Sequence, residues 1–382
     1  MNSDNRQNLK EVVQLFLKLG FTAFGGPAVH LGIMHDEVVK RRKWLNDEQF
    51  LDLVGATNLI PGPNSTEMTI HLSYLRAGWP GFILGGISFV LPAVLMVMGL
   101  AWSYQKYGAA PQVAWVLYAV KPVVIAIILK ALWFLGKQAI KDLLTGITVI
   151  AVFILNLMGM DTLVLLFSAG LIVMLIRNFG ILKKNPPTLK ILLPLSLPSA
   201  ASLIPKIFSL STLFFTFLKI GSVLYGGGYV LLAFLRSDFV VRLGWLTEKQ
   251  LIDAVAIGQV TPGPLFTTAT FIGYILAGVP GAILSTVGIF IPSFFFVAIS
   301  NRFIPKMRQS VWFSEFLNGV NAASIGLMAA VSIQLAKAVF VDRTSIILAA
   351  LSLILVIFTK ISATWIMLAA VVFGFARFWI GG

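Results

Sequence analysis

The sequence predicts an all-α polytopic membrane protein made of two homologous inverted repeats, each with about five transmembrane helices and a broken or re-entrant helical hairpin. The chain has 382 residues, of which 58% are hydrophobic and 12% charged, and its mean hydropathy is +0.91. Soluble proteins are about 25% charged, so a soluble enzyme, a disordered chain and a secreted module are excluded. The apolar residues suffice for about ten helices of about 20 residues. An internal duplication divides these helices into two sets.

The charge balance points to a lipid bilayer as the partner. Lys and Arg exceed Asp and Glu by 29 to 15, which gives a formal charge of +14. Basic cytoplasmic loops explain this excess, so we expect no nucleic-acid partner. The chain has no cysteine and only three scattered histidines, so neither a metal nor a cofactor is expected. No cleavable signal peptide is visible, and a homodimer remains open.

The duplication is read directly from the sequence. The segment FLKLGFTAFGGPAVHL at 16–31 matches FLKIGSVLYGGGYVLL at 217–232, an offset of 201 residues. The offset persists to the Pro-Gly-Pro tripeptides at 61–63 and 262–264, and it becomes 200 by Tyr74 and Tyr274. We therefore predict a first repeat at 1–182, a Pro-rich linker at 183–205 and a second repeat at 206–382.

Each repeat is expected to contain the same elements. In the first, a helix over 9–24 ends at a Gly-Gly-Pro sequence and is followed by an amphipathic basic segment through residue 43. Two stretches of about 14 residues, 47–60 and 64–77, flank Pro-Gly-Pro. Each would form a helix about 21 Å long, which is too short to span a bilayer core about 30 Å thick. These short stretches favour a re-entrant hairpin. Longer apolar spans at 81–104, 113–135, 143–157 and 162–176 complete five crossings.

An odd number of crossings turns the second repeat upside down relative to the first. With five crossings per repeat, the basic residues of both repeats gather on one side, which the positive-inside rule identifies as cytoplasmic. These residues are Lys40, Arg41, Arg42, Lys43, Lys137, Lys141, Arg177, Lys183, Lys184 and Lys190, then Arg302, Lys306, Arg308 and Lys360.

The Pro-Gly-Pro motifs are the first candidate binding site. Proline suits the first turn of a helix, and the free N–H groups of that turn favour an anion. Nearby hydroxyls add donors. The alternative is a tight turn capped by Asn64. The candidate residues are Pro61, Gly62, Pro63, Asn64, Ser65 and Thr66, with Pro262, Gly263, Pro264, Thr267 and Thr268 in the second repeat.

Two glycine clusters are the second candidate. Gly25 and Gly26 in the first repeat correspond to Gly226, Gly227 and Gly228 in the second. Glycine permits positive φ and close backbone approach, so these residues can present N–H groups to an oxyanion. Opposite the Pro-Gly-Pro motifs they would complete a cage of backbone donors. Equally, they can serve helix packing.

Repeated lysines supply positive charge. Lys18 and Lys219 occupy equivalent positions in the first helix of each repeat, where a charge costs about 3 kcal/mol at the bilayer centre. We expect them to attract or balance an anion. They can instead snorkel to the interface, or pair with the duplicated Asp52 and Asp253.

Other charges occur in one repeat only. Glu67 has no counterpart, and with His71 one turn later it is a candidate for carrying a coupling proton. The spacing from Asn64 to Glu67 is also that of a capping box. Lys121, which aligns with Asn321, and Arg76 are candidates for gating or steering.

Enzyme motifs are missing from the sequence. It has no Walker motif, no dinucleotide-binding glycine motif and no His-Glu-x-x-His. Without an ATPase domain, transport must be driven by gradients or by membrane potential. A negative interior helps anion export by about 2.3 kcal/mol per charge per 100 mV. From the residues alone we predict a gradient-driven carrier for a small oxyanion.

A family resemblance rests on four motifs. They are Phe-Gly-Gly-Pro at 24–27, Trp44-Leu45 with Gln49, Pro-Gly-Pro at 61–63 and Ala-Gly-x-Pro-Gly at 77–81. Their pattern resembles the chromate ion transporter family, specifically its long-chain members with two fused homologous domains. The second repeat departs from it at Tyr225-Gly-Gly-Gly, which allows the two repeats unequal roles.

The resemblance implies export of chromate across the bacterial cytoplasmic membrane, with chromate resistance as the result and exchange with sulfate as one mechanism. Chromate and sulfate are similar tetrahedral dianions that no residue pattern here separates. An anion channel or an organic-acid carrier is the first alternative. An intramembrane enzyme acting on a lipid phosphate is the second, and the absence of a general base at the tips speaks against it.

Overall fold

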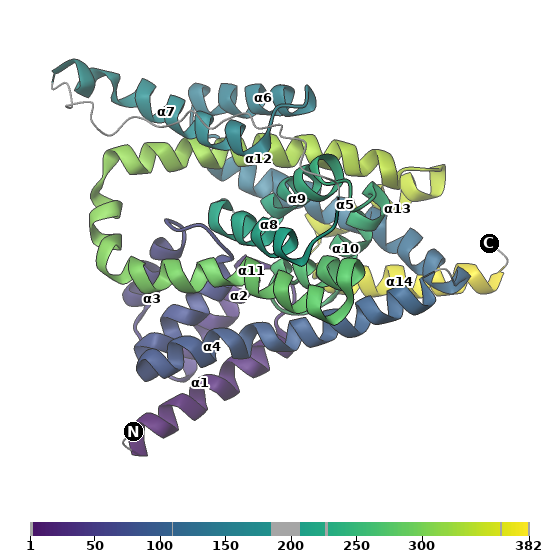
Figure 1. Cartoon of the computed structure of the whole chain (residues 1–382), viewed down its shortest axis with the longest axis horizontal. Helices are drawn as coiled ribbons and strands as arrows, with labels where there is room; N and C mark the ends of the chain where they lie inside the picture. Colours follow the sequence, from purple (N-terminus) through teal and green to yellow (C-terminus); the bar gives the residue numbers. More distant parts are fainter. Residues whose placement is uncertain (1–2, 109, 185–206, 226–227, 360, 381–382) are drawn as a thin grey trace.

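The computed structural model describes residues 3–108, 110–184, 207–225, 228–359 and 361–380, and all regular structure in these ranges is helical (Figure 1). The first repeat contains α1 (Ser3–Thr22), α2 (Pro27–His35), the π-helix η1 (Asp36–Arg41), α3 (Asp47–Thr57), α4 (Asn64–Tyr107), α5 (Pro111–Ala139), α6 (Leu143–Leu157) and α7 (Thr162–Lys184). Of the predicted linker, residues 183 and 184 belong to α7, and 185–205 lie outside the described residues.

The second repeat has a matching series of helices. It contains α8 (Leu210–Val223), η2 (Gly228–Val230), α9 (Leu231–Leu235), the π-helix η3 (Arg236–Arg242), α10 (Glu248–Val260), η4 (Leu265–Thr267), α11 (Thr268–Gln309), α12 (Val311–Val339), α13 (Arg343–Phe358) and α14 (Ala363–Ile380). Even the π-helices fall at equivalent positions.

Equivalent caps start equivalent helices. A capping box, in which side chain and backbone bond reciprocally across the first turn, begins α3 and α10, and another begins α6 and α13. The Gln residues of the family motif thereby acquire a structural role as capping partners. The four boxes pair Asn46 with Gln49, Thr247 with Gln250, Asp142 with Thr145, and Asp342 with Ser345.

Both long helices of the repeats bend sharply at an Ala-Gly pair. Gly78 has φ 61° and ψ −151°, and Gly278 has φ 61° and ψ −149°. The two segments that flank each kink lie close together. A Cβ added to Gly81 would collide with the carbonyl of Ser73, and one added to Gly281 would collide with that of Gly273. The predicted short helix over 64–77 is therefore present as the first arm of α4.

The number of membrane crossings remains a prediction. Among the described residues, five helices are long and apolar enough to cross a bilayer: Asn64–Tyr107, Pro111–Ala139, Thr162–Phe179, Leu265–Ile299 and Val311–Val339. Four shorter apolar helices accompany them: Leu143–Leu157, Leu210–Val223, Arg343–Phe358 and Ala363–Trp379.

The two repeats exchange their terminal helices. Helices α6 and α7 of the first repeat pack on α12 of the second, while α13 and α14 of the second pack on α5 of the first (Figure 1). Within each repeat the first helix packs on the long kinked helix, α1 on α4 and α8 on α11. Glycine allows this approach, since a Cβ on Gly20 would lie 2.7 Å from the carbonyl oxygen of Phe89. The interlocked repeats therefore bury one another's apolar faces.

We expect the substitution Gly78→Ala to lower the free energy of unfolding by about 1–3 kcal/mol, because a residue with a Cβ is strained at this φ and ψ. The matched control is Gly99→Ala in the same helix, because open space surrounds both glycines and Gly99 has no positive φ. Thermal unfolding in detergent measures the difference. Equal melting temperatures for the two variants would contradict a conformational role for Gly78.

Candidate functional site

Each Pro-Gly-Pro tip, residues 61–63 or 262–264, is bonded to the opposite repeat. The Gly62 N–H donates to the carbonyl oxygen of Leu224 at 2.9 Å, and the Gly263 N–H donates to that of Ala23, also at 2.9 Å. The two bonds are equivalent under the offset of 201 residues. Both acceptors follow the last turn of a first helix, α1 or α8. Each tip therefore satisfies a helix end of the other repeat.

These bonds also change the predicted cage of donors. The Gly62 and Gly263 N–H groups are engaged with protein carbonyls, so an anion must use other groups. The first N–H groups of a helix have no intrahelical acceptor. In α4 these are the N–H groups of Asn64 and Ser65, because the N–H of Thr66 already donates to Pro63 at 2.8 Å.

The glycine breaks, residues 25–26 and 226–228, meet the same region. Gly26 caps α2 with φ 83°, and a Cβ placed on it would lie 3.5 Å from the Tyr229 hydroxyl of the second repeat. Gly228 lies beside the second tip, with Leu265 3.6 Å from a Cβ built there. Gly25 has φ 110°, while Gly226 and Gly227 lie outside the described residues. The structure thus brings both tips and the described parts of both breaks together.

The hydroxyl groups at the two tips differ in their availability. Thr267 donates to the carbonyl of Pro264 at 2.9 Å, and Thr268 donates to that of Leu265 at 2.8 Å. The fully buried Thr66 hydroxyl has no hydrogen-bond partner among the described residues, and its neighbour Ser65 is buried beside it. The first tip therefore keeps a free buried donor.

The two capping interpretations of Asn64 are wrong. Pro63 is the N-cap of α4 and no side chain caps this helix. The Asn64 amide instead donates to Asn58 Oδ1 at 2.5 Å. Proline at the cap sets the backbone direction, and Asn64 is then inside the first turn, so neither the turn cap nor the capping box with Glu67 forms.

Glu67 points back over the N-terminus of its own helix. It is completely buried, and neither carboxyl oxygen has a hydrogen-bond partner within the described part of the chain. A Cβ on Gly62 would collide with Glu67 Oε1 and lie 2.7 Å from the hydroxyl of Ser293, which is also unpartnered. At the second tip, a Cβ on Gly263 would lie nearest to the Ala93 methyl group, at 2.7 Å, and next to the Gly20 carbonyl oxygen, at 3.6 Å. His71 is buried one turn after Glu67.

The repeated lysines belong to ion-pair triads. Lys18 lies 3.3 Å from Glu37, which also contacts Arg41 at 3.0 Å, and Arg42 lies beside this triad, 3.5 Å from the same carboxylate. In the second repeat, Asp238 lies 2.6 Å from Lys219 and 2.7 Å from Arg242. The pairing of Lys219 with Asp253 is therefore wrong, because the π-helix η3 supplies a nearer carboxylate.

The first triad holds its carboxylate ionised. Burial raises the pKa of the Glu37 carboxyl, but the hydrogen bond and charge of Lys18, together with Arg41 and Arg42, lower it more. The pKa of Glu37 consequently lies below its ordinary value. The Lys18 side chain is 57% exposed, so its charge stays accessible.

The buried Asp253 has a partner in α5 that sequence reasoning missed. Its carboxylate is fully buried, 2.7 Å from Lys121 Nζ of α5, and it accepts a hydrogen bond from the Tyr104 hydroxyl at 2.9 Å. The isolated Lys121 in an apolar span was the available signal. Arg76, beside the α4 kink, pairs with Glu11 at 2.8 Å and stacks on Trp44.

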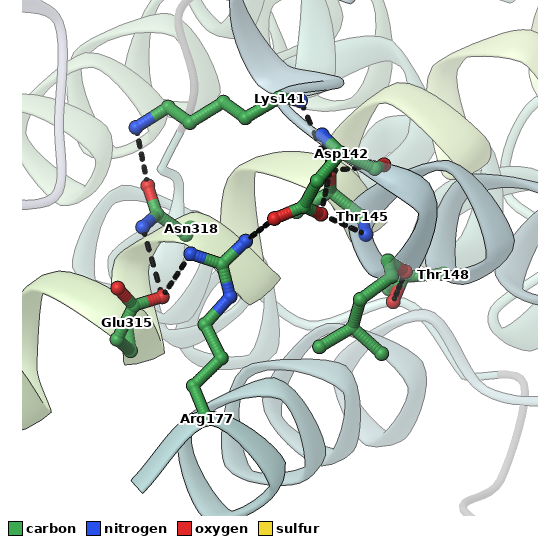
Figure 2. A network of polar contacts seen from close by, with 8 residues as sticks. Lys141, Asp142, Thr145, Thr148, Arg177, Glu315 and Asn318 are labelled. Carbon is green, nitrogen blue, oxygen red and sulfur yellow. Dashed lines mark hydrogen bonds and ion pairs between the residues drawn. The ribbon is translucent and has the colours of Figure 1, made fainter.

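A second polar network ties the exchanged helices together. Arg177 of α7 binds Asp142 at the start of α6 and reaches Glu315 of α12 at 2.9 Å (Figure 2). Lys141 donates to Asn318 at 2.7 Å in the same network. Arg177 thus has a structural role beyond the predicted basic loop.

The equivalent network of the second repeat uses an aromatic partner. Tyr118 donates to Asp342 at 2.6 Å, and Arg377 stacks over Trp115 at 5.2 Å. Trp115 aligns with Glu315, and Tyr118 with Asn318. The scaffold contacts are duplicated although their chemistry differs.

The five long apolar helices and the family match together indicate a multi-pass membrane protein of the transporter class. The chromate transporter family matches residues 10–174 and again 211–375. The chain belongs to this family, whose members are transport proteins and not enzymes.

Two of the named relatives match nearly the whole chain, and a third matches part of it. A chromate transport protein of Cupriavidus metallidurans is 31% identical over 381 residues, covering 97% of this chain and 93% of the relative. A probable chromate transport protein of Synechococcus elongatus is 31% identical over 357 residues, with 91% and 89% covered. The uncharacterized transporter YwrA of Bacillus subtilis is 28% identical over 152 residues, 37% of this chain and 85% of that protein. No solved structure matches the chain.

We expect Lys121→Met to lower the free energy of unfolding by about 3–5 kcal/mol, because it leaves the Asp253 carboxylate buried without its cation. Adding Asp253→Asn should recover most of that loss. Thermal unfolding in detergent measures both, and Lys130→Met on the exposed face of the same helix is the control. Equal losses for Lys121→Met and Lys130→Met would contradict a buried ion pair.

Proposed function

We propose that this protein exports chromate across the cytoplasmic membrane and thereby confers chromate resistance. Membership of the chromate transporter family and relatives named chromate transport proteins support this substrate. We further propose that the driving force is a gradient or the membrane potential, with exchange for sulfate as one mode. A negative interior favours outward movement of a dianion by about 2.3 kcal/mol per charge per 100 mV.

The crossed hydrogen bonds of the two tips carry the assignment of the site. They place the start of α4 in the first repeat beside the broken helix of the second, and the tip of the second repeat beside the broken helix of the first. Half-helix ends that meet in this way are the usual substrate site of inverted-repeat transporters. We propose that the oxyanion binds here, between the two tips and the two glycine breaks.

We propose that the repeats, 1–182 and 206–382, have inverted topology. The interlocking of α6 and α7 with α12, and of α13 and α14 with α5, supports two equivalent halves. In such proteins, one half rocks against the other around a fixed site. The tips and breaks come from both halves, so relative motion would open the site to one side at a time.

The lysine triads are proposed to attract the anion. Lys18 precedes Ala23 by five residues, about 7.5 Å along a helix. With Arg42 beside it, its triad holds three cations around one carboxylate, and that of Lys219 holds two cations around one carboxylate. Each triad therefore carries a net positive charge close to a glycine break. Such fields concentrate anions and accelerate their association.

Reconstituted protein should transport chromate in a saturable manner. We expect liposomes containing it to accumulate labelled chromate when an inside-positive potential is imposed, and sulfate should inhibit this uptake. Sulfate loaded inside should accelerate uptake if the two anions exchange. Protein-free liposomes are the control. No flux under either a potential or a proton gradient would refute the carrier, and unsaturable flux would favour a channel.

Opposite charge changes in one triad should have opposite effects on anion binding. Lys18→Gln should weaken sulfate binding severalfold, whereas Glu37→Gln should strengthen it, because the two changes alter the local charge in opposite directions. Calorimetric titration of the purified protein at low ionic strength measures both. Added salt should reduce both effects, since it screens exposed charges. Shifts of the same sign would argue that the triad acts only on stability.

A further inference from the structure

The two tips differ in one group that bears on transport. In the first repeat, the Glu67 carboxyl fills the space next to Gly62, which only a glycine leaves open. In the second repeat, the aligned region contains Thr267 and Thr268, whose hydroxyls donate to backbone carbonyls three residues earlier. The first tip therefore has an adjacent carboxyl group, that of Glu67, and the aligned residues of the second tip have none.

Among the described residues, hydroxyl donors lie near Glu67, and no lysine or arginine pairs with its carboxyl group. The Ser293 and Thr66 hydroxyls are both buried without partners within the described ranges. Of the titratable groups near Glu67, Tyr225, just after α8, is close enough to interact with its charge, and His71 follows it on α4. Neither carboxyl oxygen has a hydrogen bond among the described residues. The Ser293 hydroxyl, which shares the space beside Gly62 with Glu67, is thus a donor that would also suit an oxyanion.

The carboxyl also covers the helix end that would attract the oxyanion. Glu67 lies in the first turns of α4, and its side chain turns back to Gly62, just before the helix begins. A negative group is favoured at this end of a helix. An ionised Glu67 and a bound dianion would share the same donors and repel each other at close range.

We propose that Glu67 is a built-in competitor of the oxyanion, so that each oxyanion bound at this site is accompanied by one proton on Glu67. This inference rests on the proposed oxyanion site. When Glu67 is ionised, its carboxylate takes up the donors at the start of α4. When the carboxyl gains a proton, its charge is lost and the donors are free for the anion. One coupling proton is expected, because the second tip has no equivalent acid.

The sign of the pH effect follows from linkage. If the anion binds only when Glu67 is protonated, its apparent Kd rises with pH wherever Glu67 is ionised in the free protein. One linked proton gives about a tenfold change in Kd per pH unit. Below the pH at which Glu67 ionises, the Kd should be constant. Anion binding should take up protons above that pH.

The test is calorimetric titration of purified protein with sulfate at several pH values. Sulfate is the probe because it remains a dianion over this range, whereas chromate takes up a proton near neutral pH. We expect the apparent Kd of the natural protein to rise about tenfold per pH unit in the upper part of the range. Titration in buffers of different ionisation enthalpy should report uptake of about one proton per sulfate.

Glu67→Gln should bind sulfate with a Kd independent of pH and should take up no proton. Glu48→Gln is the matched control, since Glu48 is an exposed carboxylate in the first turn of α3 and should keep the pH dependence. If Glu67→Gln does not fold, proton uptake by the natural protein still decides the matter. Sulfate binding without pH dependence or proton uptake overturns the role of Glu67 alone. No binding of sulfate or chromate at any pH overturns the proposed site and this inference with it.

Discussion

The whole arrangement depends on two hydrogen bonds between the repeats. In lipid, every backbone polar group must find a partner within the protein. The last carbonyl groups of a helix have no intrahelical donor, and Ala23 and Leu224 directly follow the ends of α1 and α8. Each receives the N–H of a tip glycine, Gly263 or Gly62, from the opposite repeat. The Ala23 carbonyl also accepts a bond from the His30 ring of its own repeat, at 3.1 Å, but the tip glycine that reaches each broken helix always comes from the other repeat. The two repeats therefore share a common centre.

The duplicated features are those that shape the backbone. The kink glycines 78 and 278, the capping boxes and the two π-helices recur at equivalent positions with closely similar geometry. The charged groups within the apolar helices are less symmetric. Lys121 aligns with Asn321, Glu67 aligns with a threonine, and Arg177 pairs with carboxylates where Arg377 stacks on a tryptophan. Backbone satisfaction requires equivalence between the repeats, whereas side-chain chemistry does not.

Sequence reasoning was strongest where the signal was local or repeated. The duplication located the tips and breaks, and Pro-Gly-Pro correctly marked helix starts. Sequence reasoning could not predict which side chains of distant elements pair with one another. The acidic partners of Lys18 and Lys219 lie in π-helices, whose spacing follows no common amphipathic pattern. The spacing from Asn64 to Glu67 is that of a capping box, but Pro63 is the N-cap, so the helix begins at Asn64 itself. The predicted caps at Asn64 were therefore wrong. The pair of Lys121 with Asp253 joins residues of different repeats that no local pattern connects.

The crossed bonds also explain why glycine stands at both tips. Gly62 and Gly263 have φ values of 140° and 93°, which disfavour other residues. A side chain at either position would also collide with its neighbours, with Glu67 and Ser293 at one tip and Ala93 at the other. The same residue thus meets two requirements, a rare backbone conformation and close approach of the other repeat. At the first tip, the space that Gly62 leaves open admits the Glu67 carboxyl group. The glycine that allows the repeats to join therefore also makes room for an acidic side chain.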